Sequence, residues 1–103
     1  MADLRPMARA VAGALFRATD PDEFRPEEDW HDLGMLIEAL EIKGFCLLLN
    51  SAWQGKRIRR MASLHRESDQ GFPCMGSSEW GFYEHIGEAV LRAAHEALTA
   101  PRT

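Results

Sequence analysis

Apolar residues recur at helical spacing in three separate stretches of this chain. The first stretch predicts a helix from Leu4 to about Ala18, with the Asp3 carboxylate as its N-cap. A signal peptide fits this stretch less well, because Asp3 is acidic and no small-residue cleavage site follows. The apolar positions of the helix are Leu4, Met7, Val11, Ala14 and Leu15.

The second stretch has the clearest boundaries. Asp29 precedes it as a cap, and acidic residues concentrate at its start, where the helix dipole is positive. Lys43 and Gly44 close it, because a cation suits the negative end and glycine is free to adopt the left-handed conformation. The apolar stripe of this helix is Trp30, Leu33, Leu36, Ile37 and Leu40.

The third helical stretch lies near the end of the chain. Ser77 or Ser78 is the candidate N-cap, and Pro101 lies past the last apolar position. The apolar stripe of this helix is Tyr83, Ile86, Val90, Leu91, Ala94 and Leu98.

Between the second and third helices the pattern is typical of strands. The apolar run Phe45–Leu49 is short and follows a helix stop, which predicts a buried strand. Arg57–His65 alternates between two faces, and residues 50–56 between them predict the turn of a hairpin. Arg60 interrupts the apolar face, so its guanidinium is expected to reach the sheet end or a partner. A third strand around Phe72–Met75 is left open.

The predicted order is α-α-β-β-(β)-α, which indicates an α+β fold of two layers. A small antiparallel sheet of two or three strands packs against helices. We expect one domain over residues 1–103, because the length suits a single core. Within it, residues 1–18 form the N-terminal helix, 19–28 an acidic linker with two prolines, and 29–100 the α-β-β-(β)-α core.

Composition limits the broad class. Apolar residues make up 46% of the chain, which suffices for a core, and no apolar run approaches the roughly 20 residues of a membrane span. The two cysteines have no metal-type or scaffold-type spacing, which favours free thiols in a reducing cytoplasm. Cys46 lies in the apolar run and is expected in the core, whereas Cys74 is expected in a loop.

The charges are sorted by region. Residues 20–41 hold nine acids and one arginine, a local net charge of −8 within an overall −4. Residues 55–66 hold five bases and no acid, a local net of +5. Such a dipolar chain is suited to meet a charged partner, a nucleotide or another copy of itself.

No catalytic, metal or cofactor signature accompanies these charges. The sequence has no nucleophile elbow, phosphate-cradling loop or dinucleotide fingerprint. The four histidines do not converge with other ligands, since His85, Glu88 and His95 spread along one predicted helix. We therefore expect a non-enzymatic protein without metal or cofactor; a reactive Cys74 paired with a histidine is the enzymatic alternative.

The acidic segment has three interpretations. Its carboxylates form a face that docks on a basic surface of a partner protein complex, or they solvate a linker. Alternatively they meet Lys56–Arg66 of another copy and produce a homo-oligomer. The predicted protein-binding residues are Asp22, Glu23, Glu27, Glu28, Asp29 and Asp32.

The basic hairpin has two interpretations. An aromatic ring beside clustered cations is what a nucleobase and its phosphates require, so a short nucleotide is the candidate ligand. Alternatively the arginines form a solvated strand face. Long duplex DNA is not expected, because the acidic segment would repel its phosphates. The candidate ligand residues are Trp53, Lys56, Arg57, Arg59, Arg60, Trp80 and Tyr83.

Residues 29–38, Asp-Trp-His-Asp-Leu-Gly-Met-Leu-Ile-Glu, precede two predicted strands and the alanine-rich stretch Gly87–Leu98. In this respect Pro26–Ala100 resembles the small phage and prophage proteins of the ABA-sandwich type. The resemblance implies an α-β-β-β-α unit and a phage-borne accessory protein that acts against host defence. Such a protein would block a nuclease complex, as anti-CRISPR inhibitors do, or sequester a nucleotide signal. The double-stranded-RNA module shares this element order, but its basic helix end is missing here.

Overall fold

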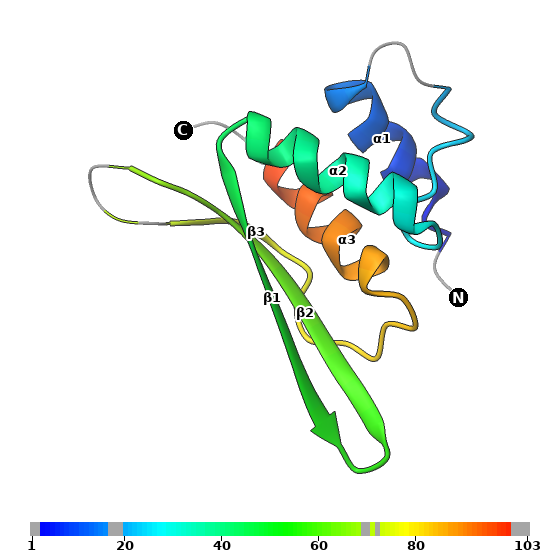
Figure 1. The fold of residues 1–103 in the computed structure, drawn as a ribbon, viewed down its shortest axis with the longest axis vertical. Helices are drawn as coiled ribbons and strands as arrows, with labels where there is room; N and C mark the ends of the chain where they lie inside the picture. The colour runs from blue at the N-terminus through cyan, green and yellow to red at the C-terminus, as the bar shows by residue number, and fades with distance from the viewer. Residues whose placement is uncertain (1–2, 17–19, 69–70, 72, 100–103) are drawn as a thin grey trace.

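The computed structural model describes residues 3–16, 20–68, 71 and 73–99. Its elements follow the order α1, α2, β1, β2, β3 and α3, so the predicted α+β class is confirmed, third strand included. Figure 1 shows the helices gathered on one side of the sheet. The elements are α1 (Arg5–Leu15), α2 (Trp30–Ile42), β1 (Phe45–Gln54), β2 (Arg57–Arg66), β3 (Cys74–Ser77) and α3 (Ile86–Thr99).

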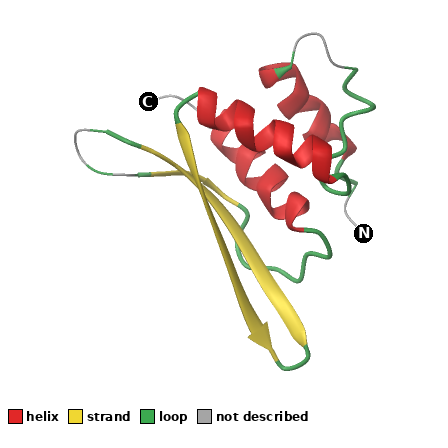
Figure 2. Ribbon diagram, in the orientation of Figure 1, coloured by secondary structure: helices red, strands yellow, loops and turns green. Residues whose placement is uncertain are grey.

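The sheet is antiparallel with strand order β1-β2-β3, and the helices form a second layer on one of its faces (Figure 2). Helix α3 packs on β2 and β3, α1 packs on α3, and α2 contacts both β1 and α3. Because the helices cover only part of the sheet, the tip of the β1–β2 hairpin extends beyond them (Figure 1). None of the helices in the described ranges has the length and apolarity that a bilayer crossing demands.

Helix α1 is shorter than predicted. Leu4 occupies the N-cap position without a side-chain hydrogen bond, although Asp3 Oδ1 accepts one from the Arg5 amide at 3.0 Å. The helix ends at Leu15, and the predicted extension over residues 17–18 lies outside the described residues. Ala14 is exposed, contrary to the predicted stripe, because Ala8, Val11 and Ala12 form the face that packs on α3.

Helix α2 confirms both predicted ends. Asp29 accepts hydrogen bonds from the amides of His31 at 2.8 Å and Asp32 at 3.2 Å. Gly44 has a φ of +93°, the left-handed conformation expected after a helix end. Trp30 departs from the predicted stripe: it is 68% exposed, and its ring lies 4.4 Å from that of His85.

Helix α3 begins later than its apolar pattern suggested. It starts at Ile86, so Tyr83 lies in the preceding segment, and neither Ser77 nor Ser78 caps it. Instead Ser78 Oγ accepts a hydrogen bond from the Ala62 amide at 2.9 Å and ties this segment to β2. The His85 ring serves the helix start, where Nδ1 accepts from the Gly87 amide at 2.9 Å.

The hairpin closes with the two-residue turn Gly55–Lys56, which is tighter than the predicted turn over residues 50–56. Glycine at the first turn position with a φ of +65° matches the type II′ turn, whose twist suits a hairpin. The prediction of a buried first strand is wrong. Of β1, only Phe45 is buried, while Leu48 and Leu49 are 53% and 49% exposed. Leu48 lies on the face of the sheet away from the helices, and Leu49 lies on the helix-facing side beyond the part that the helices cover.

The third strand lies two residues later than the predicted Phe72–Met75, and Phe72 itself is outside the described residues. Gly76 lies directly against the backbone of α3. Beyond β3 the chain continues beside β2, where Gly81 and Arg60 exchange two backbone hydrogen bonds of 3.0 and 2.9 Å. The sheet is therefore extended by an aromatic segment, Trp80–Phe82.

The acidic segment is no solvated linker in the described residues from 20 onward. Phe24 is 1% exposed and belongs to the core, and Pro26 is fully buried. The Phe24 ring packs against Phe16 at a centroid distance of 5.3 Å. Two short turns carry the chain from Asp20 to the start of α2, so this segment is part of the folded domain.

Candidate functional site

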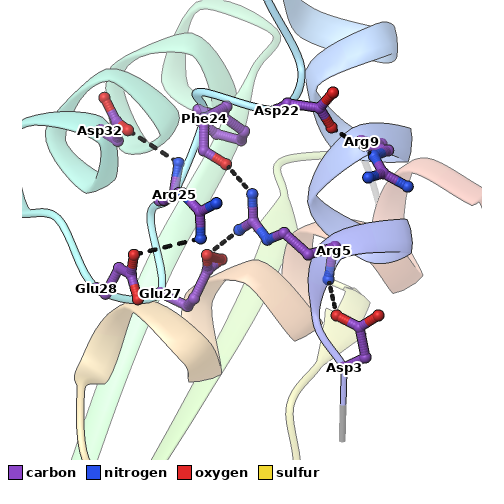
Figure 3. Close-up of polar contacts among 9 residues, drawn as sticks. All are labelled: Asp3, Arg5, Arg9, Asp22, Phe24, Arg25, Glu27, Glu28 and Asp32. Carbon is purple, nitrogen blue, oxygen red and sulfur yellow. Dashed lines mark hydrogen bonds and ion pairs between the residues drawn. The ribbon is translucent and has the colours of Figure 1, made fainter.

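Arginines of α1 bind the acidic segment from within the same molecule (Figure 3). The Arg5 guanidinium contacts the Glu27 carboxylate and also donates to the Phe24 carbonyl at 2.9 Å. The exposed pair Arg9–Asp22 has a separation of 2.8 Å between Nε and Oδ1. Burial, followed by repulsion from Arg25, lowers the pKa of Arg5 below its ordinary value. Glu27 thus sits in a partly buried ion pair.

Most of the predicted protein-binding carboxylates have such internal partners. Asp32 Oδ2 accepts from the Arg25 amide at 2.9 Å, and Glu28 lies 3.4 Å from the Arg25 guanidinium. Asp29 caps α2 as described above. Five of the six thus have an intramolecular partner, and Glu23 is simply exposed. Asp22, Glu28 and Asp29 remain exposed as well, so docking of these acids on a partner protein stays a prediction.

An acidic groove lies between this segment, the residues before α3 and the first turns of α3. Its volume is about 680 Å³. It is lined by four glutamates and one arginine among other residues, so acids outnumber bases. The lining residues are Leu4, Glu27, Glu28, Phe82, Glu84, His85, Glu88 and Arg92.

Three side chains that line the acidic groove each hold a buried polar atom without a hydrogen-bond partner among the described residues. These atoms are Glu27 Oε2, His85 Nε2 and Arg92 Nε. The Glu27 side chain is only 9% exposed, so its second oxygen has little access to bulk water. Buried polar atoms are almost always paired in folded proteins, and an unpaired group therefore indicates a missing partner such as water or a ligand.

The protonation of His85 follows from its contacts. Because Nδ1 accepts the hydrogen bond from Gly87, the neutral ring carries its proton on Nε2, which makes that atom a donor. Arg92 is held by Glu88 at 3.8 Å and lies over the Tyr83 ring at 5.7 Å. The acidic groove thus offers carboxylate acceptors beside one imidazole donor.

On the face of the sheet away from the helices, two arginines of β2 stack on aromatic rings, one of which, Phe82, also borders the acidic groove. Ala62 and Leu64 are buried under the helices, so the odd-numbered neighbours Arg57 and Arg59 lie on the outer face. The Arg57 guanidinium lies 4.0 Å from the Phe82 ring, and that of Arg59 lies 5.3 Å from the Trp80 ring. We call these four residues the arginine ladder.

The other predicted ligand residues lie elsewhere. Trp53 pairs with Ile58 across the hairpin and therefore shares the helix-facing side, where it is 73% exposed. Arg60 also points to that side and donates to the carbonyl oxygen of Tyr83, a backbone acceptor in the segment before α3, whereas the expectation was the sheet end or a partner. Lys56 lies in the turn. The structure therefore separates Trp53 and Arg60 from the ladder.

Tyr83 has a structural role. Its hydroxyl donates to the Ser78 carbonyl at 2.7 Å, and its ring lies beneath Gly81, where a side chain would clash. Arg92 covers the same ring. Tyr83 is therefore packed inside the segment before α3 instead of facing a ligand.

The cysteines differ from their predicted places. Cys46 is exposed on β1 instead of buried in the core, because the helix layer lies on the other face of that strand. Cys74 is the first residue of β3 and not a loop residue; its thiol donates to the Gly76 carbonyl at 3.4 Å. Both pair with His65 in the strand register, so the three residues form a row across the sheet.

One group of three metal-type ligands lies close together in the described parts of the chain, namely Asp29, His31 and Asp32. Asp29 Oδ1 accepts from two helix amides, and Asp32 Oδ2 accepts from Arg25. Helix capping therefore accounts for the geometry of these carboxylates.

Sequence reasoning missed Glu84 and Glu88 of the acidic groove and Phe82 of the ladder. The two glutamates approach Glu27 only through the fold, and no local pattern marks them. Phe82 had a detectable signal, because Trp80-Gly81-Phe82 places two aromatic residues at the spacing of a strand face.

No family model matches this chain, and no match is found among curated proteins or solved structures. The resemblance of Pro26–Ala100 to the phage ABA-sandwich type therefore stays a prediction.

Proposed function

We propose that this chain is a non-enzymatic binding protein whose acidic groove takes up an arginine side chain of a partner protein. The observation that carries the proposal is the buried, unpaired Oε2 of Glu27, a residue that lines a groove together with three further glutamates. A carboxylate in this state is best satisfied by a cationic donor, and guanidinium groups pair with carboxylates through parallel hydrogen bonds.

The neighbouring imidazole narrows the chemistry of the partner. His85 Nε2 donates, so it requires an acceptor where Glu27 requires a donor. An arginine in a peptide loop supplies both, with its guanidinium toward the glutamates and a backbone carbonyl toward His85. Phe82 offers an apolar wall for the methylene stem of that arginine.

The setting of this activity is proposed from the resemblance to phage proteins. In that setting the partner is a host defence complex with a basic surface. The complex is inhibited when an arginine of that surface occupies the groove. The docking surface then differs from the predicted acidic face. It keeps Glu27 and Glu28, adds Glu84 and Glu88, and leaves Asp29 and Asp32 to cap the backbone.

A titration with N-acetyl-arginine amide, followed by amide NMR shifts, tests the groove. The amides from Glu84 to Glu88 are expected to shift. The neutral isostere N-acetyl-citrulline amide is the ligand control, since it keeps the shape but lacks the charge. Equal shifts with both probes, or shifts confined to the hairpin, would contradict the proposal.

The matched variants avoid the structural carboxylates. Glu28→Gln combined with Glu84→Gln removes two charges from exposed residues of the groove and is expected to weaken arginine binding roughly tenfold. Glu23→Gln combined with Glu96→Gln makes the same charge change outside this groove and is expected to leave binding unchanged. If the Glu28→Gln, Glu84→Gln variant bound arginine as tightly as the unmodified chain, the groove would not be the arginine site.

A second candidate function rests on the arginine ladder. Each guanidinium is held on an aromatic plane, and among the described residues Arg59 Nε is buried without a hydrogen-bond partner. Pre-positioned cations beside Trp80 suit a nucleotide phosphate with its base stacked nearby. Such a protein would sequester a signalling nucleotide.

Tryptophan fluorescence with ATP as the probe separates the two candidates. If the arginine ladder binds nucleotides, ATP quenches the tryptophan emission, and the double variant Arg57→Ala with Arg59→Ala removes the quenching. The control Arg9→Ala deletes an exposed arginine on α1 and should leave the quenching intact. Inorganic triphosphate that competes as strongly as ATP would indicate charge recognition without stacking.

A further inference from the structure

Strand β1 is the outer edge of the sheet, because the strand order is β1-β2-β3 (Figure 1). Within the described part of the chain, only β2 pairs with it. An antiparallel ladder uses the backbone groups of every second residue, and the remaining N–H and C=O groups of β1 therefore point outward. This row is a template for another strand.

The sequence of β1 has none of the features that usually protect an edge. Residues 45–54 contain no charged residue and no proline. The pairing with β2 runs through all ten residues without a bulge. Natural edge strands are generally short, bulged, or interrupted by lysine or proline, because a long uncharged edge invites pairing.

Three of the large exposed apolar side chains lie on this strand. Leu48, Leu49 and Trp53 are 53%, 49% and 73% exposed. At the beginning of the strand, Ile42 at the end of α2 is 80% exposed. Large apolar residues left on one edge indicate a surface that is covered in an assembly.

The beginning of β1, at the end far from Trp53, borders a groove that suits one of these side chains. It lies between α2 and β1 and has a volume of about 550 Å³. We call it the α2–β1 groove. Its lining residues are Ile37, Glu41, Gly44, Phe45, Cys46 and Leu47.

Side chains at the two ends of β1 lie on the same face of the sheet. Phe45, Leu49 and Trp53 are separated by even numbers of residues and thus share the helix-facing side of the sheet. If a second β1 pairs antiparallel with Leu49 opposite Leu49, Trp53 of each copy lies opposite Phe45 of the other. Each tryptophan then reaches the α2–β1 groove of its neighbour.

We propose that two copies of this chain pair through β1 in this register. The result is a two-fold symmetric dimer with a continuous six-stranded sheet. This proposal is independent of the function proposed above, which requires only the acidic groove.

Charge complementarity favours a second copy as the occupant. In this register the hairpin tip, with Lys56 and Arg57, lies beside the end of α2 in the other copy, where Glu38 and Glu41 outnumber Lys43. The tip also meets the negative end of that helix dipole. In this dimer the basic hairpin of one copy would meet acids of α2 in the other, whereas the charge pattern predicted a contact with residues 20–32.

The same strand supplies both the anchor and the recess that receives it. A two-fold interface uses each of them twice, since every contact recurs with the copies exchanged. A different partner strand would need its own tryptophan at the matching position. Self-pairing requires nothing beyond this chain.

Cysteine cross-linking tests the register directly. In the Cys46→Ser, Cys74→Ser background, Leu49→Cys is expected to form a disulfide-linked dimer on mild oxidation, because the two residues face each other on the symmetry axis. Ala10→Cys, at an exposed position on α1, is the control and should form no disulfide-linked dimer. Equal cross-linking of both variants, or none at position 49, would overturn the proposed register.

Sedimentation of the unmodified chain tests the dimer itself. We expect a concentration-dependent monomer–dimer equilibrium, which Leu49→Lys shifts toward monomer by roughly tenfold or more, because it sets two lysines opposite each other. Ala10→Lys adds the same charge on α1 and should have no effect. A chain that remains monomeric up to its solubility limit would overturn the proposal.

Charge reversal tests the contact of tip and helix. Glu41→Lys and Lys56→Glu should each weaken the dimer, and the double variant should restore it, since the exchanged charges attract again. Additive weakening in the double variant would exclude this contact and the register with it.

Discussion

Gly76 of β3 and Ala93 of α3 approach so closely that no side chain fits between the strand and the helix. A Cβ on Gly76 would collide with the Ala93 carbonyl oxygen and would lie 2.7 Å from the Ala97 nitrogen. The neighbouring positions of α3 are small as well, with Ala89, Ala93 and Ala94 fully buried. The alanine-rich pattern of this helix thus permits its close approach to the sheet.

Gly76→Ala is therefore expected to destabilise the protein by about 1–3 kcal/mol, because backbone atoms must move to admit one methyl group. Urea denaturation measures the change. Gly34→Ala is the matched control: nothing lies within 4 Å of its Cβ position in α2, so the same substitution should stabilise by about 0.5–1 kcal/mol. The same sign in both variants would refute this account of the packing.

The two ion pairs of α1 should differ in strength. Arg5→Met leaves the Glu27 carboxylate uncompensated in a partly buried position and is expected to cost about 3 kcal/mol. Arg9→Met breaks the exposed pair with Asp22 and should cost less than about 1 kcal/mol. Thermal unfolding compares them, and Arg5→Met with Glu27→Leu should recover part of the loss. Equal costs would show that burial does not distinguish the pairs.

Asp29→Ala tests the start of α2. The variant removes the acceptor of two helix amides, and the expected loss of stability is about 1 kcal/mol. Glu23→Ala is the comparison, since Glu23 is an exposed acid of the same segment and should change stability by less than about 0.5 kcal/mol. A larger loss of stability for Glu23→Ala would show that Asp29 is not the main stabilising acid of this segment.

Thiol labelling distinguishes the two cysteines. Both are exposed, so a small alkylating reagent is expected to modify both in the dilute native protein. Cys46 borders the α2–β1 groove, and its labelling should slow as protein concentration rises, while Cys74 on β3 serves as the internal reference. Mass spectrometry after quenching gives both rates. If Cys46 were completely protected from labelling in dilute protein, the result would support the buried position that its apolar run predicted.

Local sequence patterns correctly predicted those elements whose boundaries depend on neighbouring residues, such as helix caps and alternating strands. The cap at Asp29 and the left-handed Gly44 bound α2 as expected, and alternation over Arg57–His65 identified the second strand. The start of α3 was misplaced because Tyr83 continues the apolar spacing by coincidence, while its hydroxyl bonds to the Ser78 carbonyl in an irregular segment.

Burial was harder to predict because it depends on which elements meet. The run Phe45–Leu49 resembles a core strand, but the helices cover only one face and only the beginning of β1. Leu48 is therefore exposed on the uncovered face, and Leu49 is exposed beyond the covered part. Phe24 and Pro26 sit among acids in the sequence, yet both are buried in the fold. The acidic groove is a product of three distant segments, so no local pattern marks Glu84 or Glu88 as partners of Glu27.

The two-residue turn at Gly55–Lys56 also bears on how the chain reaches its fold. Two strands joined by so short a loop meet at a small entropic cost of closure, and hairpins of this kind form within about 1–10 μs. The contacts of α1 with α3 instead require the two ends of the chain to come together. Folding is thus expected to proceed from the middle outward. During this interval the uncharged edge of β1 already faces other nascent chains, so refolding yield should fall as chain concentration rises.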